Sequence, residues 1–200
     1  TETDANYLMR NNFAYTRELA NWAVSRRYRF LYASSAATYG DGEFGMSDQK
    51  DELYDLRPLN MYGYSKHLFD CHAAQRGISR GIVGLKFFNV FGPNEHHKGD
   101  MRSVVYKGYQ QIVQTGRLQL FKSYRPDFRD GEQKRDFLYV KDAVEMVLHL
   151  AERPLSGGLF NIGSGQAHTW LDLGQAIFAA LGRQPQIDFV DMPDQLRAKY

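Results

Sequence analysis

Apolar residues along the chain recur first with a helical period and then in short unbroken runs. From about residue 4 to residue 27 an apolar side chain recurs every three or four positions, which predicts an amphipathic helix. The run Phe30–Ala33 predicts a short buried strand that ends in small polar residues. Asn60 is a favourable N-cap for a second helix, which the pattern carries to about Gln75.

The alternation of helix and strand continues through the rest of the sequence. Apolar runs predict strands at 82–88, 118–121, 159–162 and 187–190, and helical periods predict helices at 102–115, 140–152 and 170–181. Residues 89–100, rich in Gly, Pro and His, and the charged residues 124–134 are predicted loops. Alternating helices and strands favour an α/β fold with a largely parallel sheet.

Composition excludes several classes of protein. The 200 residues are 43% hydrophobic and carry 25 basic against 23 acidic side chains, a balance that gives no reason to expect nucleic-acid or membrane binding. The single cysteine, Cys71, excludes an internal disulfide framework and a cysteine-based zinc cluster. No apolar run approaches the roughly 18 residues of a membrane span, and no signal peptide is evident, so a cytoplasmic protein is expected.

The first candidate for chemistry is the segment Tyr62-Gly63-Tyr64-Ser65-Lys66. Tyr62 and Lys66 lie four residues apart, so on a helix they share one face. A phenol is a weak acid, and a neighbouring cation favours its ionised form. Such a pair can move a proton beside a hydride transfer, although the same spacing also arises by chance in surface pairs.

The ends of two predicted strands add polar groups. Ser34 and Ser35 end the first strand, and Asn89 follows the strand that ends at Phe88. Ligands of doubly wound sheets bind outside the carboxyl ends of the strands. A serine there can hydrogen-bond a substrate hydroxyl, or it can simply shape the turn.

Five blocks, in this order and spacing, resemble the extended short-chain dehydrogenase/reductases: Phe30–Gly40, Pro58–Lys66, Phe87–Pro93, Arg135–Val140 and Phe160–Gly165. The resemblance implies a Rossmann-like doubly wound parallel sheet whose N-terminal part precedes this chain, and a smaller C-terminal α/β domain that binds substrate. It implies that residues 1–92 belong to the dinucleotide-binding domain and residues 93–200 mainly to the substrate domain, with 135–152 returning to the first. The opening at Thr1, which lacks Met and leads at once into helical periodicity, also indicates a start inside a domain.

Within that family the details favour one group. Dehydratases carry Asp-Glu after the serine or threonine, whereas this chain has Ala36-Ala37. Ser34–Gly40, together with His97-Lys98-Gly99 and Met101, is similar to the ADP-glyceromanno-heptose 6-epimerases. That resemblance implies inversion of C6 of ADP-glycero-manno-heptose through a transient ketone, by hydride removal and return. It assigns the two acid–base roles to Tyr62 and Lys98. Without that resemblance, the favoured interpretation of Lys98 is a solvated loop lysine or a phosphate contact.

The same resemblance implies the remaining site. Ser35 would polarise the substrate hydroxyl, Lys66 would hold the nicotinamide ribose, and Arg135 would bind pyrophosphate, which suits its planar fork. The implied cofactor contacts are Asn11, Tyr62, Lys66 and Val90, and the implied substrate contacts are Ser35, Asn89, Asp100, Lys107, Phe121, Lys122, Ser123, Tyr124, Arg135 and Tyr200. The family has Ser at Asp100 and His at Lys107, and its loop at 122–134 is shorter, so the nucleotide contacts there are expected to differ.

The cofactor and partners follow from the resemblance as well. The resemblance implies NADP as the cofactor. NAD stays open as the alternative, because the glycine-rich dinucleotide fingerprint is absent from this chain and Gly163-Ser164-Gly165 is too short to replace it. The adjacent His96 and His97 do not fit a helical metal pair, so no metal is expected. An ADP-sugar substrate and a homo-oligomer, a pentamer in the family, are implied. Two alternatives stay open: a UDP-hexose 4-epimerase, for which Lys98 would be dispensable, and a non-catalytic relative, which would typically lose the Tyr/Lys pair.

Overall fold

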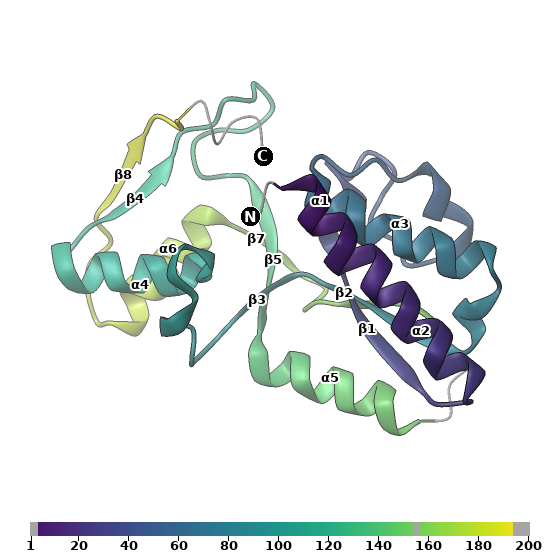
Figure 1. Cartoon of the computed structure of the whole chain (residues 1–200). Coiled ribbons are helices and arrows are strands. Elements are labelled where there is room, and N and C mark those ends of the chain that lie inside the picture. Colours follow the sequence, from purple (N-terminus) through teal and green to yellow (C-terminus); the bar gives the residue numbers. More distant parts are fainter. Residues whose placement is uncertain (1–3, 154–156, 194–200) are drawn as a thin grey trace. The chain divides into compact units, whose positions relative to one another are not determined.

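The computed structural model describes residues 4–153 and 157–193. The chain forms two compact units, built from the described parts of 1–88 with 142–162, and of 89–141 with 163–200 (Figure 1). The chain therefore crosses from one unit to the other three times. Each unit has its own β-structure and its own apolar core.

The sheet of the first unit contains three parallel strands in the order β1-β2-β6, namely β1 (Phe30–Ser35), β2 (Ile82–Phe87) and β6 (Gly158–Ile162). Phe30 pairs with Ile82 at one end of β1 and Ser35 with Phe87 at the other. Five of the six residues of β2 are buried, as expected for a central strand. The parallel α/β sheet predicted from the sequence is thus confirmed, and within the described residues β1 lies at its edge.

The helices of the first unit follow the predicted pattern. The N-terminal helix is continuous but changes its winding, from α1 (Ala5–Leu8) through the π-helical η1 (Met9–Ala14) to α2 (Tyr15–Ser25). The other helices of this unit are α3 (Met61–Gln75), most of α5 (Val140–Glu152) and the short 3₁₀ turns η2 (Ala36–Tyr39), η3 (Lys50–Asp55) and η4 (Ile78–Arg80). Asn60 caps α3 as predicted, because its side chain accepts a hydrogen bond from the amide of Gly63 at 2.9 Å.

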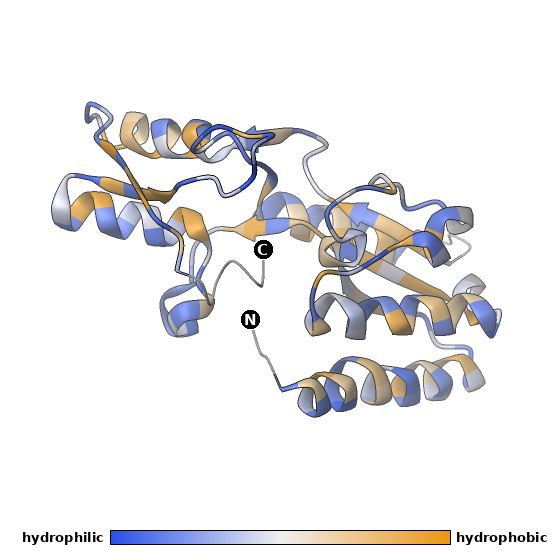
Figure 2. Cartoon of the chain, turned by 90° about the horizontal axis from the view of Figure 1, so that it is seen from above, coloured by the Kyte–Doolittle hydropathy of each residue, from blue (hydrophilic) through white to orange (hydrophobic). Residues whose placement is uncertain are grey.

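A shared core attaches two of these helices to the sheet. Ala20 of α2, Phe69 of α3, Tyr32 of β1 and Ile82 of β2 are all buried in one cluster. The ring of Tyr32 packs edge-on against that of Phe69, with the centroids 4.6 Å apart. In Figure 2 the N-terminal helix, which ends with α2, carries both apolar and hydrophilic residues along its length, as expected for a helix that buries one face.

The second unit contains two small sheets. Strand β3 (Asn89–Phe91) pairs in parallel with β5 (Lys134–Tyr139), and β5 pairs antiparallel with β7 (Ala167–Thr169). The parallel strands β4 (Leu118–Phe121) and β8 (Ile187–Val190) form the other sheet. The helical elements of this unit are η5 (His96–Met101), α4 (Val104–Thr115) and α6 (Trp170–Ala180). Its core cluster contains Ile112, Leu118, Ile177 and Phe178.

Several predictions of local structure need correction. Residues 89–100 are not all loop, because they contain β3 and most of η5, and neither β5 nor β7 was predicted. Strands β3 and β7 have three residues each, too few to show an alternating period, and β5 begins with the charged Lys134-Arg135-Asp136. Cys71, whose place within a predicted helix favours a small buried residue, is only partly buried. Among the described helices, none combines the length and the apolarity needed to cross a membrane.

Candidate functional site

Tyr62 and Lys66 share one face of α3, as their spacing predicts. The Nζ atom of Lys66 lies 6.0 Å from the centroid of the Tyr62 ring. The same Nζ atom donates a hydrogen bond to the carbonyl oxygen of Ala33 in β1, at 2.8 Å. The lysine therefore joins the helix that carries the phenol to the strand that carries Ser35.

The environment of Lys66 makes it a suitable donor for a ligand. Burial lowers the pKa of Lys66 below its ordinary value, and the carboxylate of Asp70 partly opposes that shift. An ammonium group has three N–H donors, and the bond to Ala33 uses one of them. The others can reach hydroxyl groups of a bound ribose, so this residue fits a nicotinamide nucleotide.

Ser35 lies at the carboxyl end of β1, where it starts the turn η2. The residue is 9% exposed, and its Oγ atom accepts a hydrogen bond from the amide of Ala37 at 3.1 Å. Its carbonyl oxygen accepts a hydrogen bond from the hydroxyl of Thr38 at 2.8 Å. A serine hydroxyl that accepts in this way can still donate its own proton to a substrate oxygen.

Asn11 lies in the π-helical segment η1. Its side chain is exposed, and its Nδ2 atom donates to the carbonyl oxygen of Tyr7 at 2.8 Å. The neighbouring Asn12 donates to the hydroxyl of Ser65 in α3 at 3.0 Å, which attaches η1 to the helix that carries Tyr62. Single turns of π-helix occur frequently at functional sites.

Lys98 belongs to the second unit, where it lies on η5. Its Nζ atom is 4.0 Å from Oε2 of Glu95, and the lysine side chain is 47% exposed. Glu95 is buried and accepts hydrogen bonds from the amide of Gly92 and from both the amide and the hydroxyl of Ser103. Burial alone would raise the pKa of Glu95, but the hydrogen bonds from Ser103 and Gly92 and the charge of Lys98 hold it below its ordinary value. Glu95 thus anchors the loop that presents Lys98.

Asn89, Val90 and Arg135 lie on the paired strands β3 and β5. The side chain of Asn89 donates to the carbonyl oxygen of Asp136 at 3.1 Å, and Val90 pairs with Leu138. Arg135 is exposed, and its guanidinium group contacts the carbonyl oxygen of Lys134 at 2.7 Å. The carboxylate of Asp136 accepts hydrogen bonds from the turn at Ser164 and Gly165.

The remaining predicted substrate contacts also lie in the second unit, apart from Tyr200, which is outside the described residues. The Nζ atom of Lys107 donates to the carbonyl oxygen of Asp100 at 2.6 Å, so these two predicted contacts lie side by side. Phe121, at the end of β4, and Tyr124 are exposed. Lys122 forms an ion pair with Asp191 at 3.1 Å, and the amide of Ser123 bonds to the carboxylate of Asp130 at 2.7 Å.

One segment of this chain has a spacing of glycines that the sequence analysis did not mention. Gly40-Asp41-Gly42-Glu43-Phe44-Gly45 has the letters of the dinucleotide motif. These residues follow the turn η2 and lead into an irregular segment before η3, so they do not open an α-helix. Without a helix N-terminus beside the glycines, the segment lacks the group that binds pyrophosphate in a true fingerprint.

Sequence reasoning missed two charged residues in the first unit. Asp70 lies within α3 and Lys86 is the penultimate residue of β2, and both side chains are buried. A charged residue inside the apolar run 82–88 was the available signal for Lys86. No group of three or more His, Cys, Asp or Glu side chains in the described part of the chain is placed to hold a metal ion.

The chain belongs to the NAD dependent epimerase/dehydratase family, whose pattern it matches over residues 1–163. Among relatives, it is 55% identical over 200 residues to the ADP-L-glycero-D-manno-heptose-6-epimerase of Nitratidesulfovibrio vulgaris, and covers 62% of that protein. It is 45% identical over 209 residues to the protein of the same name from Fusobacterium nucleatum, and covers 63% of it. In both alignments the whole of this chain is matched.

The chain is also similar in fold to a solved structure whose name is that of these relatives. The crystal structure of the Helicobacter pylori ADP-L-glycero-D-manno-heptose-6-epimerase superimposes with a TM-score of 0.80 at 27% identity. The match covers 96% of this chain and 57% of that one. The Rossmann-like fold expected from the sequence is thus confirmed.

Proposed function

We propose that the complete gene product is an ADP-glyceromanno-heptose 6-epimerase. It inverts C6 of ADP-glycero-manno-heptose through a transient ketone, by removing and returning one hydride. The names of relatives at 55% and 45% identity support this function. The chain spans about 62% of the length of the first of these relatives, so the function is proposed for the whole protein and not for this segment alone.

The observation that carries the proposal is the arrangement of Tyr62, Lys66 and Ser35 around the carboxyl end of β1. Lys66 bridges α3 and β1 through its bond to Ala33, and its Nζ atom lies 6.0 Å from the centroid of the Tyr62 ring. Tyr62 accepts the proton of the substrate hydroxyl, and Ser35 donates a hydrogen bond to the same oxygen. This part of the site lies entirely within the first unit.

A nicotinamide cofactor, NADP with NAD as the alternative, fits the same region. When bound, it supplies the hydride acceptor and donor of the reaction. Lys66 holds its ribose through the N–H donors that Ala33 does not use. Asn11, Val90 and Tyr62 complete the cofactor contacts that this chain contributes.

The second unit supplies the second acid–base group and the nucleotide contacts. Lys98 serves the face of the carbon opposite to Tyr62, and Asn89 binds the sugar. Arg135 binds the pyrophosphate, and the remaining contacts to the ADP-sugar come from Ser35, Asp100, Lys107, Phe121, Lys122, Ser123, Tyr124 and Tyr200. In this assignment residues 1–92 belong to the cofactor domain, 93–200 mainly to the substrate domain, and 135–152 return to the first. The enzyme acts in the cytoplasm as a homo-oligomer, for which the family implies a pentamer.

The test is direct conversion of one pure epimer. The complete gene product is incubated with ADP-D-glycero-manno-heptose, and the two C6 epimers are separated and quantified over time. We expect approach to the same epimer ratio from either starting epimer, since a catalyst does not change an equilibrium constant. Lack of conversion of the ADP-heptose, alongside conversion of a UDP-hexose at C4, would refute the assignment.

A further inference from the structure

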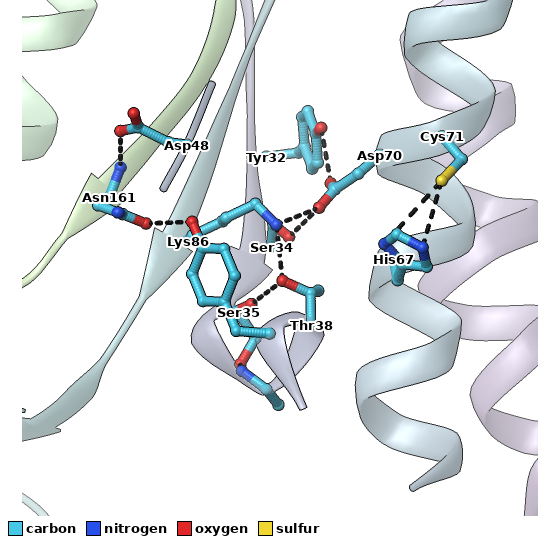
Figure 3. Close-up of polar contacts among 12 residues, drawn as sticks. Tyr32, Ser34, Ser35, Thr38, Asp48, His67, Asp70, Cys71, Lys86 and Asn161 are labelled. Atoms are coloured by element: carbon cyan, nitrogen blue, oxygen red, sulfur yellow. Dashed lines mark hydrogen bonds and ion pairs between the residues drawn. The ribbon is translucent and has the colours of Figure 1, made fainter. Parts of the chain in front are cut away.

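A buried ion pair joins α3 to β2 near the carboxyl end of that strand (Figure 3). The Nζ atom of Lys86 lies 3.3 Å from Oδ2 of Asp70, and the two side chains are 1% and 0% exposed. Burial raises the pKa of Asp70 and lowers that of Lys86, while the charge of each partner opposes the shift of the other. The pair lies outside the groups to which the proposed reaction assigns a role.

Asp70 ties the helix to the first strand. Its Oδ1 atom accepts a hydrogen bond from the Tyr32 hydroxyl at 2.9 Å, and its Oδ2 atom accepts one from the Ser34 hydroxyl at 2.7 Å. Both donors belong to β1, and Ser34 directly precedes Ser35. Asp70 also lies four residues after Lys66, so the two residues share a face of α3.

Lys86 ties the second strand to the turn that follows Ser35. Its Nζ atom donates to the hydroxyl of Thr38 at 2.6 Å, and that hydroxyl donates to the carbonyl oxygen of Ser35 at 2.8 Å. The same ammonium group lies 4.5 Å from the centroid of the Tyr39 ring. Tyr39 in turn donates to the side chain of Asn161 in β6 at 2.6 Å. The contacts of Lys86 therefore converge on the backbone of η2.

Stability alone is a weak explanation for this arrangement. Removing two charges from water is costly, and apolar side chains of similar volume often stabilise a core as well as a buried ion pair does, or better. A polar network differs from such a core in that its bonds have fixed directions, so it selects one orientation of the groups attached to it. Here the attached groups are the strand and turn that bear Ser35 and the helix that bears Tyr62 and Lys66.

We propose that Asp70 and Lys86 are positioning residues, which hold Ser35 and the Tyr62/Lys66 face of α3 in their reactive arrangement. The inference rests on the function proposed above, because it assumes the roles of those three residues. Asp70 fixes α3 against Ser34, and Lys86 fixes η2 through Thr38. Neither residue contacts substrate or cofactor in this scheme.

Kinetics of the complete enzyme provide the first test, with Lys86→Met and Asp70→Asn compared with Phe69→Leu. Phe69 lies on the same helix turn and is 1% exposed, so its variant loses packing but no polar contact. Each variant is assayed well below its own melting temperature. We expect both charge variants to lose about tenfold or more in kcat, equivalent to about 1.4 kcal/mol in the barrier, with KM within about threefold. Lys86→Arg should recover most of the loss, because it keeps the charge.

A kcat in the charge variants no lower than that of Phe69→Leu would overturn the proposal and leave the pair a purely structural feature. The same conclusion would follow if Lys86→Arg were as slow as Lys86→Met. Should Lys86→Met fail to fold, Asp70→Asn, which keeps the shape of the side chain, still decides between these outcomes.

Hydrogen exchange separates this inference from the proposed function. In Lys86→Met the amides of residues 36–40 should exchange about tenfold faster than in Phe69→Leu, since the turn has lost its anchor. Equal exchange in the two variants would overturn the anchoring role, whether or not the protein epimerises ADP-heptose. Absence of epimerisation by the wild-type enzyme, with the expected exchange pattern, would instead count against the proposed function.

Discussion

Gly63 and the carbonyl oxygen of Ala37 lie so close that a Cβ atom on Gly63 would be 2.5 Å from that oxygen. The same Cβ would lie 3.1 Å from Cβ of Pro58. Helix α3 can therefore approach η2 only because residue 63 has no side chain. That approach places the first turn of α3, with Tyr62, against the turn that begins at Ser35.

Replacing this glycine should separate the helix from the turn. Gly63→Ala would ordinarily favour a helix by about 1 kcal/mol, but here the new methyl group meets backbone that cannot yield easily. We expect a net destabilisation of about 1–3 kcal/mol, as in other overpacked sites, together with a loss of activity. Urea unfolding and the epimerase assay measure the two effects.

The matched control is Gly81→Ala, where the nearest atom to an added Cβ is the Ile78 carbonyl oxygen at 3.6 Å, an ordinary contact. It should leave activity near that of the wild type. If Gly63→Ala were as stable and as active as Gly81→Ala, the close approach of α3 to η2 would have no functional meaning.

A second prediction concerns the pH dependence of stability. Burial, together with the positive charges of Lys86 and Arg57, lowers the pKa of His67 to about 4. The unfolded chain titrates this histidine near its ordinary value of about 6.5, so the unfolded state binds the proton first as the pH falls. His67 therefore contributes its full stabilisation above about pH 6.5 and loses it between about pH 6.5 and 4.

The measurement is the free energy of unfolding at pH 7 and pH 5 for the wild type and for His67→Gln. Other groups titrate in the same range, so the useful quantity is the difference between the two proteins. We expect the wild type to lose more stability than the variant on acidification, by on the order of 2 kcal/mol. Equal losses would mean that His67 is protonated equally in the folded and unfolded states.

The sequence predicted the helices and strands of the site better than the contacts that hold these elements together. Asn60, Tyr62 and Lys66 could be placed on one helix because capping and side-chain spacing are local properties. The contact between Asp70 and Lys86 joins residues 16 positions apart on different elements, and no local sequence pattern predicts such a pair. The short strands β3 and β7 were missed for a related reason, since partners distant in the sequence define them.

A third prediction follows from the geometry around Tyr62. Tyr62→Phe should fold normally, because the phenyl ring keeps the packing of the partly buried side chain. Loss of the hydroxyl removes the proposed acid–base group, and general acid–base catalysis contributes typically about 10²–10⁴-fold. We expect a fall in kcat of that order at similar KM. Tyr64→Phe, two residues away and 48% exposed, is the control and should stay near wild-type activity.

The last prediction tests whether the reaction uses two acid–base groups. Inversion requires hydride return to the face opposite its removal, so the two epimers present their hydroxyls to different sides of the carbon. In the proposed mechanism Tyr62 serves one side of the carbon and Lys98 the other, and each group must come within roughly 3 Å of the oxygen whose proton it moves. Oε2 of Glu95 lies 4.0 Å from Nζ of Lys98 and accepts a hydrogen bond from the amide of Ser103, so Glu95 anchors the loop that carries the lysine.

Lys98→Met keeps the length of the side chain but removes the amine. In the complete enzyme, the oxidation of each epimer by the oxidised cofactor should be measured separately, with an aldehyde analogue of the intermediate added to accept the hydride from the reduced cofactor. A two-base enzyme should lose activity toward one epimer by about 10²-fold or more and keep most of its activity toward the other, because Tyr62 is intact. Lys141→Met, which alters an exposed lysine of α5, is the control for a general effect of lost charge. Unchanged turnover of both epimers by Lys98→Met would remove Lys98 from the chemistry and favour an epimerase that works with Tyr62 alone.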